Sequence, residues 1–333
     1  MPKRTVVLTA AGGAGTIEII KSLKALGGYR VVALDASPHA CGFAFSDEAR
    51  LMPFATAPDY PRAIREVLDE YHPDVLIPLV DEEILLFHDL LDEPKYCEIK
   101  LLTPRREFCR ICLDKWLLAE ALGKAGLPAP RTWLAEEAGG AVYPAVIKPR
   151  QGRGSREVAY LAGPGDLSDY LERADKPPSA YIVQEQATGA EFTTSAIVGL
   201  DGSVLGVVPK EVPVKKGITQ VGITRRAQSV DALCRDVQSR LKADGPFNVQ
   251  HFLGPQGPSI IEINPRYSTT VALTIGAGVN EVDLVLRHAF GEAVEAPDFV
   301  PDLLMVRYST QIFSKASDWP FPVGGKTDQQ EES

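Results

Sequence analysis

The sequence predicts an α/β protein in which a parallel-sheet unit precedes an α+β unit. In the first hundred residues, short β-branched runs alternate with segments of helical periodicity, which is typical of parallel strands joined by crossover helices. Beyond Pro128 and Pro130, strand-like runs follow one another around short turns such as Asp201-Gly202, which indicates antiparallel hairpins. The 333 residues are 45% hydrophobic, enough to bury cores in roughly two or three domains.

The first unit is expected to begin with a strand, a glycine turn and a helix. The turn Gly12-Gly13-Ala14-Gly15 follows the first apolar run, and the apolar residues after it recur at helical spacing until Gly27 ends the helix. The same alternation continues to about residue 102. We expect strands at 6–9, 31–34, 75–79 and 101–102, and helices at 17–26, 60–71 and 82–91.

The second unit is expected to open with a helical stretch at 105–126, which Pro128 and Pro130 end. Later turns at 201–202 and 255–258 separate runs of β-branched residues. The polar residues from Gly324 onward predict a disordered tail. We expect strands at 142–148, 181–184, 192–198, 204–208, 249–253 and 260–263, and helices at 167–174 and 281–290.

Composition excludes several classes of protein. The 35 basic and 44 acidic residues give a net charge of −9, which disfavours a nucleic-acid surface. The longest apolar runs are far short of the roughly 20 residues that span a bilayer, so we expect no membrane protein. Five scattered cysteines do not make a disulfide framework, and Cys109 and Cys112 stand without a metal-binding partner. Because no cleavage site follows the basic start, we expect a cytoplasmic protein.

The N-terminal glycine turn leaves two interpretations open. Asp35 ends the second strand about twenty residues after the turn, where the ribose-binding acid of a dinucleotide site stands. If Gly13 and Gly15 are the first two glycines of such a site, Glu18 takes the third position, where a small residue is needed. The other interpretation is a structural turn between a strand and a helix.

Two polar residues near the end of the second unit are spaced for a metal site. On the strand expected at 260–263, Glu262 and Asn264 project to the same face because side chains alternate. Oxygen ligands of this kind suit Mg²⁺, which takes one or two protein carboxylates and completes its octahedron with water and phosphate oxygens. The alternative is a polar face exposed to solvent.

Gln250 and Arg266 extend the same cluster. The run 248–252 alternates polar and apolar residues, so a hairpin would place Gln250 beside Glu262, and its amide oxygen can be a further ligand. The same alternation points His251 away from the cluster, toward packing. Arg266, just past the strand, supplies a planar cation suited to a phosphoryl group in transfer.

Upstream, a lysine precedes a glycine-rich loop. Lys148 ends the strand expected at 142–148, and residues 151–156 follow as a loop whose backbone amides can close over phosphates. The loop is not a Walker A sequence, and a lysine before such a loop is also typical of a surface turn. Lys115 offers a second lysine at the start of the preceding helical stretch.

The strand expected at 181–184 runs into polar residues. The backbone of a strand end can pair with the edge of an adenine ring. Glu185 and Glu191 follow where acids can reach the adenine amino group or the ribose hydroxyls. The segment is therefore a candidate nucleoside-binding edge.

Taken in order, these pieces resemble the ATP-grasp superfamily, most closely the branch similar to the carbamoyl-phosphate synthetase large subunit and to pyrrolysine-pathway-type ligases. The resemblance covers nearly the whole chain. It implies an α/β architecture in which a Rossmann-like domain precedes a two-lobed α+β ATP-grasp fold. The implied parts are the Rossmann-like domain at 1–112, the N-terminal lobe at 113–186, the C-terminal lobe at 187–316 and a polar tail at 317–333.

The resemblance also implies a role for each candidate residue. Lys148 and Arg266 would be the catalytic cations, with Lys115 and Lys148 on the ATP phosphates and Glu191 on the ribose. Residues 151–155 would form the lid loop and residues 184–188 the adenine hinge. The nucleotide contacts would be Lys115, Lys148, Gln151, Gly152, Gly154, Ser155, Gln184, Glu185, Gln186, Thr188 and Glu191, and the metal ligands Gln250, Glu262 and Asn264.

The activity that the resemblance implies is an ATP- and Mg²⁺-dependent carboxylate–amine ligase, with Mn²⁺ able to replace Mg²⁺. A carboxylate attacks the γ-phosphorus to give an acyl phosphate, ADP is released, and an amine then displaces phosphate. Lysines, an arginine and a metal suffice for such a transfer without a covalent nucleophile. The implied partners are a small-molecule carboxylate and amine, and a homodimer is common among similar enzymes.

The chain departs from the family pattern, and alternatives stay open. Residues 267–270 stand where many relatives have glycines and small residues, and one grasp unit of this length is too short for the two-module carbamoyl-phosphate enzyme. The alternative functions are an NAD-dependent oxidoreductase using the first domain and a non-catalytic ATP-binding protein.

A basic segment in the second unit has two interpretations. It faces the substrate carboxylate or the triphosphate in one, and it forms a solvated loop in the other. Its residues are Lys210, Lys215, Lys216, Arg225 and Arg226.

Overall fold

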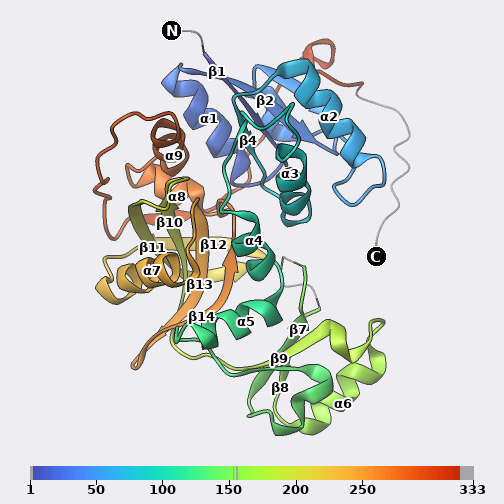
Figure 1. Cartoon of the computed structure of the whole chain (residues 1–333), viewed down its shortest axis with the longest axis vertical. Coiled ribbons are helices and arrows are strands. Elements are labelled where there is room, and N and C mark those ends of the chain that lie inside the picture. The colour runs from blue at the N-terminus through green and yellow to red at the C-terminus, as the bar shows by residue number, and fades with distance from the viewer. Residues whose placement is uncertain (1–2, 153, 155–156, 323–333) are drawn as a thin grey trace.

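Three β-sheets organise the computed structural model, which describes residues 3–152, 154 and 157–322 (Figure 1). At one end lies a five-stranded parallel sheet with the strand order β3-β2-β1-β4-β5. A six-stranded antiparallel sheet, in the order β14-β13-β10-β11-β12-β15, occupies the middle, and a four-stranded antiparallel sheet, in the order β6-β9-β7-β8, forms the far end. The predicted α/β architecture, a parallel unit followed by an α+β unit, is confirmed.

The parallel sheet buries apolar side chains on both of its faces, because helices cover both. Val6 and Leu8 belong to one core and Val7, between them, to another. The strand β3 was not expected; it lies at the edge of the sheet with its residues half-buried or exposed. The elements are β1 (Arg4–Leu8), α1 (Thr16–Leu26), β2 (Tyr29–Asp35), β3 (Glu48–Leu51), α2 (Tyr60–Tyr71), β4 (Val75–Ile77), α3 (Ile84–Leu91) and β5 (Lys100–Leu101).

Two helices lead from the parallel sheet to the small four-stranded sheet. They are α4 (Arg106–Cys112) and α5 (Lys115–Lys124), and Asp114 separates them by accepting hydrogen bonds from the Trp116 and Leu117 amides as an N-cap. The predicted single helical stretch is thus two helices. The small sheet comprises β6 (Thr132–Leu134), β7 (Ala145–Pro149), β8 (Ala159–Leu161), α6 (Pro164–Arg173) and β9 (Tyr181–Glu185).

The six-stranded sheet carries the longest strands, which fold back on one another as hairpins. The strand expected at 204–208 continues to Lys216 and pairs with a strand that the sequence analysis missed. The elements are β10 (Ala190–Val198), β11 (Val204–Lys216), β12 (Ile218–Thr224), α7 (Gln228–Leu241), β13 (Phe247–Gly254), β14 (Gly257–Asn264), α8 (Val271–Gly276), α9 (Glu281–Ala289) and β15 (Leu304–Val306).

A shared core joins the parallel sheet to the six-stranded sheet. Val6 and Leu8 of the first cluster with Val271 and Leu286 from the segment after β14. The glycine turn is part of this contact, because a side chain at Gly15 would place its Cβ 3.0 Å from the Ser268 backbone oxygen. The N-terminal unit is therefore held against the end of β14, where the candidate site lies.

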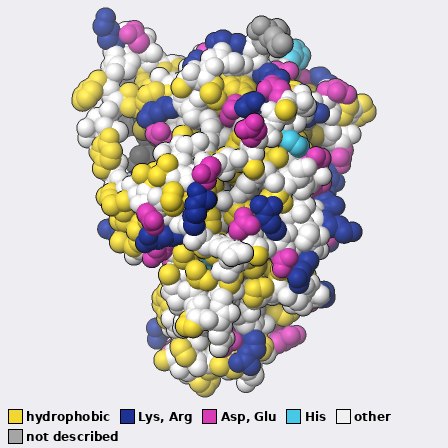
Figure 2. Space-filling model, turned by 90° about the vertical axis from the view of Figure 1, so that its left-hand side faces the viewer, with side chains coloured by type: hydrophobic (Ala, Val, Ile, Leu, Met, Phe, Trp, Pro, Cys, Tyr) yellow, Lys and Arg dark blue, Asp and Glu magenta, His cyan; other side chains and the backbone are white. Residues whose placement is uncertain are grey.

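The structure bears on three further expectations. The described residues include no helix of the length and apolarity needed to cross a membrane. Charged side chains of both signs are intermingled on the face that Figure 2 shows. The tail expected from Gly324 onward lies outside the described residues.

Candidate active site

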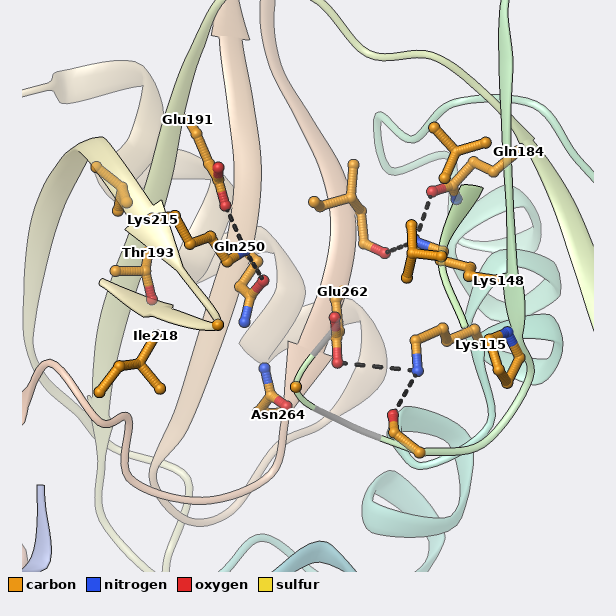
Figure 3. A pocket seen from close by; sticks show the side chains of 18 of the residues that line it. Lys115, Lys148, Gln184, Glu191, Thr193, Lys215, Ile218, Gln250, Glu262 and Asn264 are labelled. Carbon is orange, nitrogen blue, oxygen red and sulfur yellow. Dashed lines mark hydrogen bonds and ion pairs between the residues drawn. The ribbon is translucent and has the colours of Figure 1, made fainter. Parts of the chain in front are cut away.

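A cleft of about 1050 Å³ lies between the small sheet and the six-stranded sheet. Strands β7 and β9 and the loop after β7 form one wall, and β10, β11, β13 and β14 form the other (Figure 3). The cleft brings together nearly all of the predicted site residues. They are Lys115, Lys148, Gln151, Gly152, Gly154, Gln184, Glu185, Gln186, Glu191, Gln250, Glu262, Asn264 and Arg266.

The β13–β14 hairpin presents a face of carboxylate and amide groups to the cleft. Gln250 pairs directly with Glu262, as the alternating pattern predicted. Asn264, two residues beyond Glu262, is on the same side of the strand and also lines the cleft (Figure 3). Three oxygen-bearing side chains from neighbouring strands thus face one space.

The oxygen atoms on this face suit a Mg²⁺ ion that is also bound by phosphate oxygens and water. Among the described residues, no group of three or more His, Cys, Asp or Glu side chains is placed to hold a metal. One carboxylate and two amides are too few charges for a protein-only site, but they suit an ion that also takes phosphate oxygens and water. The Gln250 Oε1 atom accepts a hydrogen bond from the Lys215 ammonium over 3.4 Å.

Two lysines approach this face from the opposite wall. The Lys115 Nζ lies 4.0 Å from the Glu262 Oε1 and donates to the Gly152 carbonyl over 2.8 Å (Figure 3). The Lys148 Nζ donates to the Gln184 Oε1 over 2.9 Å and to the Ile261 carbonyl over 3.4 Å. The lysines are therefore aimed at the space in front of Glu262.

Lys148 is buried, and this changes its acidity. Only 8% of its surface is exposed. Desolvation lowers the pKa of the ammonium to about 8, although the Glu262 carboxylate acts in the opposite direction. A group with this pKa changes charge just above neutral pH, and a bound polyanion would favour its charged form.

Lys215 connects two residues that were predicted separately. Its Nζ forms an ion pair of 2.6 Å with the Glu191 Oε1 while also reaching Gln250. Glu191 was predicted to meet the ribose and Gln250 the metal. Lys215 therefore crosses from one expected subsite to the other, and it occupies the cleft side of β11.

The rest of the basic segment does not face the cleft. Lys210 is fully buried in β11, where it donates to Ser195 and Thr274. Arg225 pairs with Glu211 and Asp302, and Arg226 pairs with Asp298. Lys216 is exposed. The segment is neither a solvated loop nor a cluster on the triphosphate, because it belongs to the β11–β12 hairpin and only Lys215 lines the cleft among these five.

The predicted adenine edge is only partly available. The Gln184 side chain accepts from Lys148 and donates to the Thr132 hydroxyl over 2.9 Å. The backbone amides of Glu185 and Gln186 donate to carbonyls within the same lobe. These two amides are therefore already used and do not donate to an adenine ring. Thr188 is exposed and is not part of the cleft lining, and Ser155 lies outside the described residues.

Arg266 reaches the cleft with a partner that the sequence analysis missed. Its guanidinium forms an ion pair with Asp81, which follows β4 of the parallel sheet, and donates to the Tyr267 carbonyl over 3.3 Å. An acid of the N-terminal unit thereby fixes the predicted phosphate-side cation. The separation of 185 residues between the two explains why no local pattern could indicate the pair.

The glycine turn has the geometry of a structural turn. The Asp35 carboxylate accepts from the Gly12 amide and the Ser37 amide, each over 2.8 Å. Gly15 faces Ser268 and Thr269 at 3.0 to 3.1 Å from the position of a Cβ atom. The Asp35 carboxylate thus already accepts hydrogen bonds from this segment, and the other unit covers the turn. This geometry does not favour the NAD interpretation.

Two family models match the chain, and together they cover most of it. Residues 112–270 match an ATP-grasp domain, and residues 6–102 match a PylC-like N-terminal domain. The formate-dependent phosphoribosylglycinamide formyltransferase of Mycobacteroides abscessus is 22% identical, over 88% of this chain and 78% of that protein. The 3-methyl-D-ornithine–L-lysine ligase of Methanosarcina acetivorans is 26% identical, over 82% of this chain and 70% of that protein.

Solved structures share the fold. The ADP complex of N5-carboxyaminoimidazole synthetase from Staphylococcus aureus superposes with a TM-score of 0.72 at 17% identity, covering 92% of this chain and 81% of that one. Biotin carboxylase from Campylobacter jejuni superposes with a TM-score of 0.69 at 14% identity, covering 87% of this chain and 71% of that one. The predicted pairing of a Rossmann-like domain with a two-lobed fold is therefore the arrangement of known proteins.

Proposed function

This chain belongs to the ATP-grasp superfamily, and from that premise we propose that it is an ATP- and Mg²⁺-dependent ligase that joins a carboxylate to an amine. The relatives named above act on different substrates but have C–N bond formation in common. The single observation that carries the proposal is the opposition of charges across the cleft, where Lys115 and Lys148 face Glu262.

The proposed reaction has two steps. In the first, an oxygen of the substrate carboxylate attacks the γ-phosphorus of ATP, and the bond from that phosphorus to the β-phosphate oxygen breaks. ADP leaves, and the carboxylate has become an acyl phosphate. In the second, the amine nitrogen attacks the acyl carbon, the carbon–oxygen bond to phosphate breaks, and the amine proton passes to the departing phosphate or to water. Neither step needs an oxidant or a covalent enzyme intermediate.

The chain's own residues position the reactants and balance their charge. Lys115 and Lys148 would neutralise the phosphates from one wall. Arg266, held by Asp81, would present its donors to the transferring phosphoryl group. Gln250, Glu262 and Asn264 would hold Mg²⁺, which when bound withdraws charge from the phosphate oxygens.

We also propose the boundaries of the parts and the oligomeric state. The Rossmann-like domain would span 1–112, the two lobes 113–186 and 187–316, and the polar tail 317–333. A likeness to the biotin carboxylase domain dimer of Hydrogenobacter thermophilus, at a TM-score of 0.70, supports a homodimer.

The identity of the nucleotide product tests the proposed function. Purified protein is incubated with Mg·ATP and a library of carboxylates and amines, and nucleotides are separated by chromatography. We expect ADP and phosphate in equal amounts, formed only when an active carboxylate is present. AMP with pyrophosphate would contradict the acyl-phosphate route. Binding of Mg·ATP without any product would favour the non-catalytic ATP-binding protein, and thermal stabilisation by NAD(H) but not by Mg·ATP would favour the oxidoreductase.

A further inference from the structure

A fully buried lysine lies beneath the helices α8 and α9. The ammonium of Lys210, in β11, donates to the Ser195 hydroxyl over 2.6 Å and to the Thr274 hydroxyl over 2.8 Å. Ser195 in turn donates to the Glu281 carboxylate over 3.0 Å, and Glu281 is also buried. These four side chains come from β10, β11, α8 and α9. They form one buried polar network, which is called the Lys210 network below.

The Lys210 network continues a row of side chains that begins at the proposed metal site. Across the six-stranded sheet, Glu262 pairs with Gln250, and Gln250 pairs with Thr193. Thr193 pairs in turn with Lys210. Residues that pair directly in neighbouring antiparallel strands project to the same face of the sheet. Lys210 is therefore on the face that carries the proposed metal ligands, at the place where helices cover that face.

The network places charge in the interior of the protein. Desolvation lowers the pKa of Lys210 to about 8, although the Glu281 carboxylate acts in the opposite direction. Replacing a buried pair of opposite charges with apolar side chains of similar volume is often neutral or stabilising for a fold. The stability of the fold therefore does not by itself account for these charges, and the segments that they join become the relevant question.

The network fixes one end of the segment that carries Arg266. Residues 265–270 connect β14 to α8, and the Arg266 side chain lines the cleft. The segment starts at Asn264, which is held by its pairing with β13. It ends at α8, where Thr274 accepts from Lys210. The segment is thus anchored at both ends, and the Lys210 network is the second anchor.

The same helices support the unit that supplies the partner of Arg266. The helices α8 and α9 lie between the parallel sheet and the six-stranded sheet, and they contribute to the core that the two sheets share (Figure 1). The Tyr29 hydroxyl of β2 donates to Asp283 of α9 over 2.7 Å. Asp81, which pairs with Arg266, belongs to the parallel-sheet unit. Both the backbone of Arg266 and its ion-pair partner therefore depend on how α8 and α9 are held on the six-stranded sheet.

We propose that Lys210 is a positioning residue, which places Arg266 for the γ-phosphate of ATP by fixing α8 and α9 to the sheet. This inference rests on the proposed function, in which Arg266 meets the transferring phosphoryl group. Without the network, the segment 265–270 would hold Arg266 less firmly in front of that group. The rest of the nucleotide would be bound by other residues, such as Lys148 and Glu191, so the affinity for ADP would change little.

Substitutions at Thr274 test this role with little change in volume. Thr274→Val removes the hydroxyl that accepts from Lys210 and keeps the shape, whereas Thr274→Ser keeps the hydroxyl and removes a methyl group. Titration calorimetry compares Mg·ADP with the Mg²⁺ complex of the β,γ-imido analogue of ATP. In Thr274→Val we expect the Kd of the analogue to rise at least about fivefold and that of ADP to change by less than about twofold. Thr274→Ser should bind both nucleotides as the wild type does.

Two further variants complete the test. Thr224→Val removes an equally buried hydroxyl, which donates to the Val300 carbonyl over 2.7 Å and lies outside the network, so both affinities should stay unchanged. Lys210→Met removes the ammonium itself and should reproduce the selective loss of affinity for the analogue. If thermal unfolding shows that Lys210→Met does not fold, Thr274→Val decides the question.

A role in stability alone predicts the opposite order of effects at Thr274. Serine lacks a methyl group that packs in the interior, and valine keeps it. A larger loss in Thr274→Ser than in Thr274→Val, unchanged analogue binding in Thr274→Val, or equally weakened binding of both nucleotides would each overturn the proposal. Absence of analogue binding to the wild-type protein would also overturn it.

This measurement needs no turnover, so its failure can be told apart from failure of the ligase function. A selective loss of analogue affinity in Thr274→Val, together with no ADP release by the wild type, would sink the ligase function and leave the role of Lys210 standing. ADP release by the wild type, together with unchanged analogue affinity in Thr274→Val, would do the reverse.

Discussion

Replacing Glu262 with glutamine is expected to lower kcat by at least about a hundredfold, since even outer-sphere partners of a metal contribute 10- to 100-fold. The carboxylate is the only charged group on the β13–β14 face, where Gln250 and Asn264 supply neutral amides. Glu262→Gln keeps the shape and removes the charge. Steady-state ADP release at saturating Mg·ATP measures the effect.

Two controls separate loss of the metal ligand from loss of the fold. The variant should unfold at nearly the wild-type temperature, because the Glu262 side chain faces the cleft and not a hydrophobic core. Glu136→Gln removes an exposed carboxylate outside the cleft and should leave kcat unchanged. Wild-type kinetics in Glu262→Gln would reject the metal assignment.

Lys148→Ala is expected to weaken ATP binding by about 1.5–3 kcal/mol, the scale of a hydrogen bond to a charged group, or roughly 10- to 150-fold in Kd. The ammonium is buried and directed into the cleft, so solvent screens it weakly. Titration calorimetry with Mg²⁺ and a non-hydrolysable ATP analogue measures the change. Lys124→Ala, at a side chain that is 77% exposed, should bind the analogue as the wild type does. Equal affinities in the two variants would remove Lys148 from the phosphate site.

The same lysine gives nucleotide binding a pH dependence of definite sign. Burial lowers the pKa of Lys148 to about 8 in the free protein, and bound phosphates favour the charged ammonium. Above that pH a proton must be taken up on binding, so ATP affinity should fall between about pH 7 and about pH 9.5. Lys148→Arg stays charged throughout and should flatten the profile. A flat wild-type profile would contradict this role.

The hairpin face could be predicted because its determinants are local. A strand has a period of two residues, and the pattern of residues 248–252 and 260–264 fixes which side chains share a face. The turn between Gly254 and Gly257 starts the pairing, and a register shift between Gln250 and His251 then sets Gln250 against Glu262. The helix α7 was not predicted, although its sequence indicates it. Its buried residues Val230, Leu233, Cys234 and Val237 recur at helical spacing.

Lys215 and Lys210 show what local patterns cannot supply. Between Glu211 and Lys215 the register of β11 against β12 shifts twice, and each shift can change the face on which a side chain falls. Lys210 is fully buried, and its ammonium donates to the hydroxyls of Ser195 and Thr274, which come from β10 and the helix α8. The partner of Arg266 is likewise set by the packing of one unit on another.

A crystal structure of the protein with Mn²⁺ and a non-hydrolysable ATP analogue is the most direct measurement of the central claim. The anomalous scattering of Mn²⁺ locates the ion independently of the side chains. The account predicts one ion or more bound by Glu262 and Asn264 together with phosphate oxygens, with Lys148 on the opposite side of the triphosphate. An ion away from both residues, or a nucleotide seated in the parallel-sheet unit, would contradict it.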